Sequence, residues 1–162
     1  MDMHFRSSTR VSARKSPVQD MKLKLDACQR QLDVWRDELR ALPECPLPDA
    51  GSCAGLDICP CSRTVDGIIA GAVEFMNEHF TRENTLMRRG SGIRGLRELF
   101  ELHAEDHGII MSSLVKTLEL PTPCRQRRAL TTLFDQRLQR HLVTHDSLLR
   151  EELPRLHYRA QA

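Results

Sequence analysis

A histidine and a glutamate interrupt the apolar side of a helical stretch at FMNEHFTRENTLM, residues 75–87. His79 and Glu83 are four residues apart, so on a helix they lie one above the other on the same face. The apolar residues before and after them continue that face, which predicts that both side chains point into the protein interior. Burial of such groups is unfavourable without a common partner, and imidazole and carboxylate are good ligands for iron, zinc or manganese.

Two further apolar stripes are interrupted in the same way. His103 and His107 are again four residues apart, on the stripe that begins at Leu96. His141 lies on the stripe of the last helical stretch, and Asp146 follows it at similar depth. Four core histidines on three expected helices, together with two carboxylates, predict a common metal site rather than separate structural histidines.

Four helical stretches are expected to position these residues, because apolar side chains recur at spacings of three and four. Thr64 is the predicted N-cap of the second stretch, and Thr122 of the fourth. No strand candidate is convincing, since aromatic residues make up only 4% of the chain and β-branched residues are scattered. The sequence therefore predicts an all-α protein, an up-down-up-down antiparallel four-helix bundle with stretches at about 21–42, 64–89, 96–118 and 122–153.

The remaining residues lie before and after the expected bundle. Residues 1–18 are predicted to form a flexible basic arm, residues 19–156 the bundle, and residues 157–162 a tail or linker. The net charge of +2 does not indicate nucleic-acid binding, and no apolar run is long enough for a membrane span. The N-terminus lacks the apolar stretch of a secretory signal. We therefore expect a cytoplasmic protein with no nucleic-acid or membrane partner.

The three polar sets resemble motifs of the hemerythrin family, in its bacterial branch. They read H-F-x-x-E, H-x-x-x-H and H-x-x-x-x-D and occur in the family's order, one on each of three consecutive helices. A ferritin-type centre is excluded, because no Glu precedes a His by three residues. The resemblance covers roughly residues 21–153 without the Cys-rich loop, and it implies a non-haem centre of two Fe that binds oxygen or a similar small molecule. By the same resemblance, one metal is held by His103, His107 and His141, the other by His79, and both are bridged by Glu83 and Asp146.

The first helix departs from the family pattern. The family has a histidine within a stretch like I-D-x-x-H-x-x-L, whereas this chain reads L-D-A-C-Q-R-Q-L and has Gln29 in the histidine's place. Gln29 could coordinate weakly through its oxygen, or the second metal could bind poorly and leave a mononuclear or mixed site. Alternatively, a water, Cys28 or a histidine from elsewhere (His4 or His145) could fill the position. An open or water-filled position is favoured, with His145 expected at an outer or exposed place. Zinc or manganese in place of iron stays open.

Cysteines are concentrated in the Pro-rich segment 43–63, which is expected to be a long loop between the first two helices. No C-x-x-C pair is present, which argues against a zinc ribbon or a thioredoxin-like motif. The thiols could stay reduced, bind zinc or form a redox-switchable disulfide. The C-P-C segment at 59–61 is too tight for easy pairing, so a disulfide would need Cys45 or Cys53. The cysteines of this loop are Cys45, Cys53, Cys59 and Cys61.

Two classes of function fit these features. The first is a binding module that senses or carries oxygen, nitric oxide or redox state. A sensor is favoured over an enzyme, because nothing else in the chain resembles a catalytic domain. The ending ELPRLHYRAQA could also lead into an effector domain or contact a protein partner. The alternatives are an iron-dependent peroxidase or oxidase-type enzyme that uses peroxide, and an iron storage or repair protein.

Overall fold

The structure, a computed structural model, describes residues 17–43, 59, 61–90, 92, 93 and 95–159. Within this part there is no strand, which confirms the predicted all-α class. The predicted arm up to residue 16, most of the Cys-rich loop with Cys45 and Cys53, His4 and residues 160–162 lie outside the described residues. The helical elements are α1 (Pro17–Ala41), α2 (Ser62–Gly90), α3 (Arg97–Leu118), α4 (Pro123–Thr132), η2 (Leu133–Leu138), α5 (Gln139–His141), η3 (Leu142–Asp146) and α6 (Ser147–Arg159).

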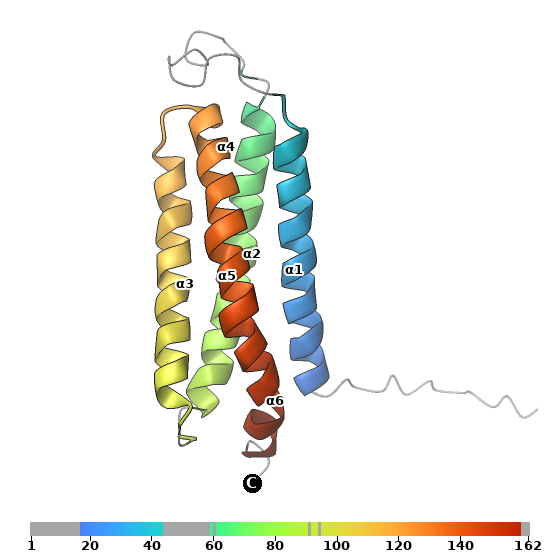
Figure 1. Cartoon of the computed structure of the whole chain (residues 1–162), viewed down its shortest axis with the longest axis vertical. Helices are drawn as coiled ribbons and strands as arrows, with labels where there is room; N and C mark the ends of the chain where they lie inside the picture. Colours follow the sequence, from blue (N-terminus) through green and yellow to red (C-terminus); the bar gives the residue numbers. More distant parts are fainter. Residues whose placement is uncertain (1–16, 44–58, 60, 91, 94, 160–162) are drawn as a thin grey trace, which may run out of the picture.

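The last five elements are continuous along the chain and form one helical segment, residues 123–159. Figure 1 shows this fourth segment side by side with α1, α2 and α3 along the long axis of the molecule. The colours along the ribbons show that consecutive segments run in alternating directions. No helix in the described part of the chain is long and apolar enough to cross a membrane.

Helix ends follow the local sequence with one exception. Thr122 is the N-cap of α4 as predicted, since its side chain accepts a hydrogen bond from the Arg125 N–H at 3.3 Å, and Pro123 follows as the first helical residue. The prediction that Thr64 caps α2 is wrong, because α2 already begins at Ser62. α1 and α6 also extend slightly beyond the predicted limits of 19 and 156.

An aromatic cluster and one arginine join α1 to the fourth segment. Trp35 stacks on Phe134 with ring centroids 5.6 Å apart and meets the edge of Phe75 on α2 at 5.7 Å. Arg36 is largely buried, forms an ion pair with Asp135 at 2.7 Å and donates a hydrogen bond to the Phe134 carbonyl at 3.1 Å. These contacts pack α1 against the fourth segment.

Two turns of the fourth segment, η2 and η3, are π-helical. In an α-helix with 3.6 residues per turn, two residues five positions apart point about 140° away from each other. A π-helical turn, with hydrogen bonds between residues five apart, instead aligns them. The turn at η3 therefore brings Asp146 to the same buried side as His141, while His145 is only partly buried. This explains how the five-residue spacing of H-x-x-x-x-D can serve one site.

Candidate metal centre

Six polar side chains converge in the interior from α2, α3 and the fourth segment. They are the six residues to which the sequence assigned ligand roles, so the predicted convergence is found. Each is almost inaccessible to solvent: His79 5%, Glu83 0%, His103 2%, His107 3%, His141 0% and Asp146 2% exposed.

The Glu83 carboxylate lies between two groups of histidines. Its Oε1 is 3.5 Å from Nε2 of His79. Its Oε2 is 3.4 Å from Nε2 of His103 and 3.1 Å from Nε2 of His107. The two oxygens of one carboxylate therefore face two different sets of imidazole nitrogens.

Asp146 repeats this arrangement from the opposite side. Its Oδ2 is 3.3 Å from Nε2 of His79. Its Oδ1 is 3.4 Å from Nε2 of His103 and 2.9 Å from Nε2 of His141. Both carboxylates thus have one oxygen toward His79, and the other toward His103 and one further histidine.

The donor atoms have the spacing that a metal ion requires. Nitrogen and oxygen ligands at about 2.1 Å from a metal lie about 3 Å apart when their bonds are at right angles. Four of the buried donor atoms have no hydrogen-bond partner among the described residues, and all four point into this centre: Glu83 Oε1, His103 Nε2, His141 Nε2 and Asp146 Oδ1. Such atoms are unfavourable in an apolar interior, and a cation would satisfy them together.

Neighbouring side chains hold two of the histidines in the tautomer that a metal requires. His107 Nδ1 donates to Asn84 Oδ1 at 3.1 Å, and His141 Nδ1 donates to Asp106 Oδ2 at 2.9 Å. With the proton on Nδ1, each Nε2 presents its lone pair to the centre. Arg137 in turn contacts Asp106 at 2.6 Å. The sequence reasoning missed Asn84 and Asp106, although each directly adjoins a predicted ligand.

Replacing Asp106 with Asn should weaken metal binding by about 10–100-fold, because the amide orients His141 less firmly and lowers its basicity. The measurement is a competition titration against a chelator of known affinity. Asp66 to Asn, an exposed change on α2, is the control and should leave the affinity unchanged. An unaltered affinity in the Asp106 variant would show that its contact with His141 does not tune the centre.

The first helix contributes Cys28 rather than Gln29. The Gln29 side-chain amide donates to Asp33 at 3.0 Å on the outer side of α1, so Gln29 does not reach the centre. Cys28 is fully buried, and its sulfur lies within 4.8 Å of ligand atoms of both His79 and Asp146. Of the alternatives that lie among the described residues, Cys28 is the one whose ligand atom groups with His79 and Asp146.

His145 lies at the edge of the centre rather than in it. Its ring is 5.3 Å from that of His141 and 5.1 Å from that of His103, and it is partly exposed. One of its ring nitrogens lies within 4.8 Å of a ligand atom of Asp106 and of a ring nitrogen of His141. This agrees with the outer position expected from the sequence.

In the metal-free protein, protonated histidines supply part of the positive charge beside the buried carboxylates. Burial lowers the pKa of His79, but hydrogen bonds, the largest from Asp146, outweigh it and raise the pKa to about 11. Burial also opposes protonation of His103, but its close contacts with the carboxylates of Asp146 and Glu83 raise its pKa to about 9. For His107, burial dominates and lowers the pKa to about 4. The metal-free centre thus holds protons where a metal would supply positive charge.

These shifts predict how the stability of the metal-free chain depends on pH. The stabilisation from protonated His103 is fully present below its ordinary pKa of about 6.5 and is lost as the pH rises through about 9. His107 has the opposite effect on stability. The unfolded chain binds a proton at this residue near pH 6.5, whereas the folded chain does so only near pH 4, so stability is lost as the pH falls between these values. Urea unfolding in chelator should therefore give a maximum near pH 6.5. Stability that increases from pH 6.5 to 9 would contradict this charge balance.

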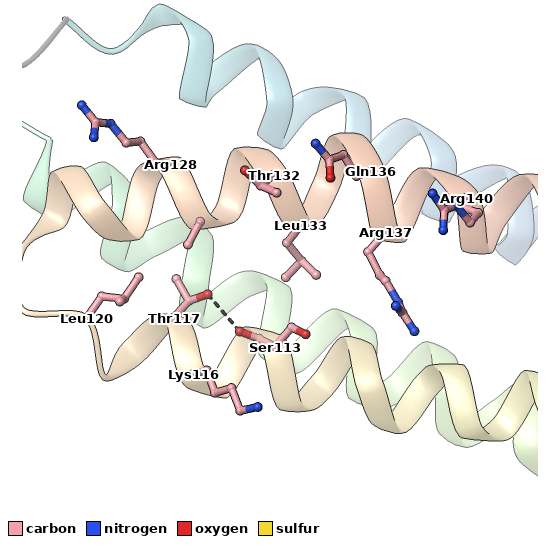
Figure 2. A pocket seen from close by; sticks show the side chains of 11 residues that line it. Ser113, Lys116, Thr117, Leu120, Arg128, Thr132, Leu133, Gln136, Arg137 and Arg140 are labelled. Carbon is pink, nitrogen blue, oxygen red and sulfur yellow. Dashed lines mark hydrogen bonds between the residues drawn. The ribbon is translucent and has the colours of Figure 1, made fainter. Parts of the chain in front are cut away.

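A groove of about 610 Å³ lies between α3 and the fourth segment, and Figure 2 shows its lining. Basic side chains are prominent in it, namely Lys116, Arg128, Arg137 and Arg140. None of the six converging residues lines this groove. Arg137, which Figure 2 shows extending toward α3, contacts the Asp106 that holds His141. The groove is thus separate from the metal centre but shares one arginine with its outer contacts.

Comparison of the chain with protein-family models, curated proteins and solved structures finds no match. The interpretation of the centre therefore depends on its own geometry. That geometry consists of buried clusters of histidine, glutamate and aspartate that could hold a metal ion.

Proposed function

We propose that this chain is a hemerythrin-like, up-down-up-down four-helix bundle that holds two iron ions and senses or binds a small molecule. The observation that carries the proposal is the orientation of two carboxylates, Glu83 and Asp146. Each turns one oxygen to His79 and the other to the histidines on the opposite side. Two cations side by side require bridging negative charge, and this orientation supplies it to both.

The two proposed positions differ in their protein ligands. The first has three imidazoles, from His103, His107 and His141, and one oxygen of each carboxylate. From the part of the chain that the structure describes, the second has His79, the Cys28 thiol and the other carboxylate oxygens. The second position is therefore the more open one, where a small ligand would bind.

The surroundings favour a small ligand over a larger substrate. Phe80 stacks on His107 at 3.9 Å, and buried Met76 and Phe80 belong to the apolar core next to the centre. Bound iron would supply reversible redox chemistry and an open position for oxygen, nitric oxide or peroxide. The protein contributes burial, a tautomer held by Asn84 and Asp106, and exclusion of bulk water. These features support a sensory or carrier role.

The test of this proposal is metal content combined with spectroscopy. Metal-free chain is reconstituted anaerobically with ferrous iron, desalted, analysed for iron per chain, and then mixed with oxygen or nitric oxide. We expect about two iron ions per chain and a change in the near-ultraviolet spectrum with either gas. Fewer than one iron per chain, with zinc retained instead, would overturn the iron assignment.

Exchange of the residue in the second position gives a sharper prediction. Cys28→His should keep two irons per chain and lengthen the lifetime of the spectral change with oxygen, because a second imidazole beside His79 replaces the thiol. Gln29→His is the matched control on the adjacent residue. It should change neither property, since that side chain faces Asp33 at the outer surface. The measurement is stopped-flow absorbance after mixing with oxygen. Equal effects of both variants would contradict the assignment of Cys28.

A further inference from the structure

Three buried cysteines that take no part in the proposed iron centre gather where α2 and α4 begin. Cys59, Cys61 and Cys124 are 7%, 2% and 7% exposed, and their sulfur atoms all lie within 4.8 Å of one another. Cys124 is 63 positions from Cys61 in the sequence and approaches it only through the packing of α4 beside α2. Figure 1 shows the starts of these two helices next to each other at one end of the molecule.

The spacing of the sulfurs suits a shared cation better than a disulfide. Two thiolates bound to one zinc ion at about 2.3 Å lie about 3.8 Å apart in a tetrahedral arrangement. A disulfide requires a sulfur–sulfur distance of about 2.05 Å and a specific dihedral geometry. Three sulfurs within 4.8 Å need only a small contraction to meet a metal, and a third thiol has no role in a disulfide.

Burial and the neighbouring Cys59 raise the pKa of the Cys61 thiol, but nearby positive charge partly offsets the negative charge that thiolates bring. Cys61 immediately precedes α2, where its carbonyl accepts the Val65 N–H at 2.9 Å. Cys124 lies in the first turn of α4, directly after Pro123. Both helix N-termini carry partial positive charge, and Arg127 adds a full charge close to Cys61. Three thiolates with one divalent cation leave a net charge of −1, which these groups offset.

We propose that Cys59, Cys61 and Cys124 form a zinc site that joins the start of α2 to the start of α4. The three thiols lose their protons to solvent as the cation binds, and a water molecule completes the fourth position. Soft thiolate ligands select zinc or a similarly thiophilic cation over magnesium or calcium. The site is independent of the iron centre, because it shares no ligand with it.

The experiment measures how zinc alters the reactivity of individual thiols in the full chain. Metal-free protein is incubated with one to three equivalents of zinc or with magnesium, then treated with iodoacetamide, and the labelled cysteines are identified by mass spectrometry over time. We expect zinc, but not magnesium, to slow labelling of Cys59, Cys61 and Cys124 at least tenfold. Equal labelling rates with and without zinc would overturn the proposal, as would a disulfide between two of these thiols that persists in zinc.

A substitution distinguishes zinc bound by these three cysteines from zinc bound at the proposed iron centre, whose ligands also suit zinc. Cys124→Ser should lower retained zinc by one ion per chain and remove the protection of Cys59 and Cys61. Cys28→Ser, another buried cysteine on a different helix, should leave that protection intact. Unchanged protection in the Cys124 variant would contradict the site. The labelling of the unaltered chain remains decisive if the variant folds poorly.

Discussion

Replacement of Glu83 with Gln is expected to remove both of the metal ions proposed for the centre. Each carboxylate oxygen faces a different set of histidines, so one substitution withdraws negative charge from both positions. Loss of a partner that only orients a ligand weakens binding by about 10–100-fold, and loss of a bridging ligand should exceed about 100-fold. Metal per chain, measured after dialysis against a weak chelator, should fall from two to near zero.

A matched control for this change is available on the same helix. Glu78 is exposed and pairs with Arg82 at the surface, so Glu78→Gln should leave metal content unchanged. Circular dichroism of both variants would establish that the helices persist. Retention of one ion by the Glu83 variant would contradict this prediction. That ion would then be held at the three-histidine position without the Glu83 carboxylate, and Glu83 would not be a ligand shared by two metals.

The second large effect concerns the aromatic contact between α1 and the fourth segment. Phe134→Ala should lower the free energy of unfolding by about 3–5 kcal/mol, because it leaves a cavity under Trp35 in a fully buried region. The hydrogen bond from Arg36 to the backbone carbonyl of residue 134 would persist, since it does not involve the ring. Urea unfolding in the presence of chelator separates this loss from any effect of metal.

Val143→Ala on the same segment is the corresponding control. Val143 is 62% exposed, so its truncation should alter stability by less than about 0.5 kcal/mol. Phe134 supplies no candidate ligand atom, so the Phe134 variant should still bind metal under conditions where it is folded. A loss smaller than about 1 kcal/mol would indicate that Trp35 and Phe134 do not form a tight part of the core.

The sequence predicted most of the centre because its chemistry follows helix periodicity. His79 with Glu83 and His103 with His107 are spaced by one α-helical turn within apolar stripes, so their faces could be read directly. The same spacings of three and four place Cys28 on one helix face with Leu25 and Leu32, and all three side chains are buried. The family motif placed Gln29 where the histidine is expected and left the ligand open; in the structure Cys28 is buried, whereas the Gln29 side chain donates to Asp33.

Features that depend on tertiary packing could not be predicted from the sequence. Asp106 lies on the flank of its helix, and only the approach of the fourth segment turns it into a partner for His141. The meeting of Cys124 with Cys61 also needs α2 and α4 side by side, and no local pattern encodes it. The start of α2 was misplaced by two residues, because Thr64 is a good N-cap type but the helix extends past it.

The π-helical turn at η3 has a consequence for how this protein tolerates insertion and deletion. A π turn contains one residue more than an α turn over the same path, so removal of one residue between His141 and Asp146 would leave a plain α-helical spacing of four. Both residues would again share a face, and the buried Leu149 and Leu153 downstream would keep their orientation. A single-residue length change is therefore structurally silent at this point. Two chains that differ by this one residue would place the same side chains in the centre. A sequence motif with a fixed spacing between the histidine and the aspartate would nevertheless match only one of them.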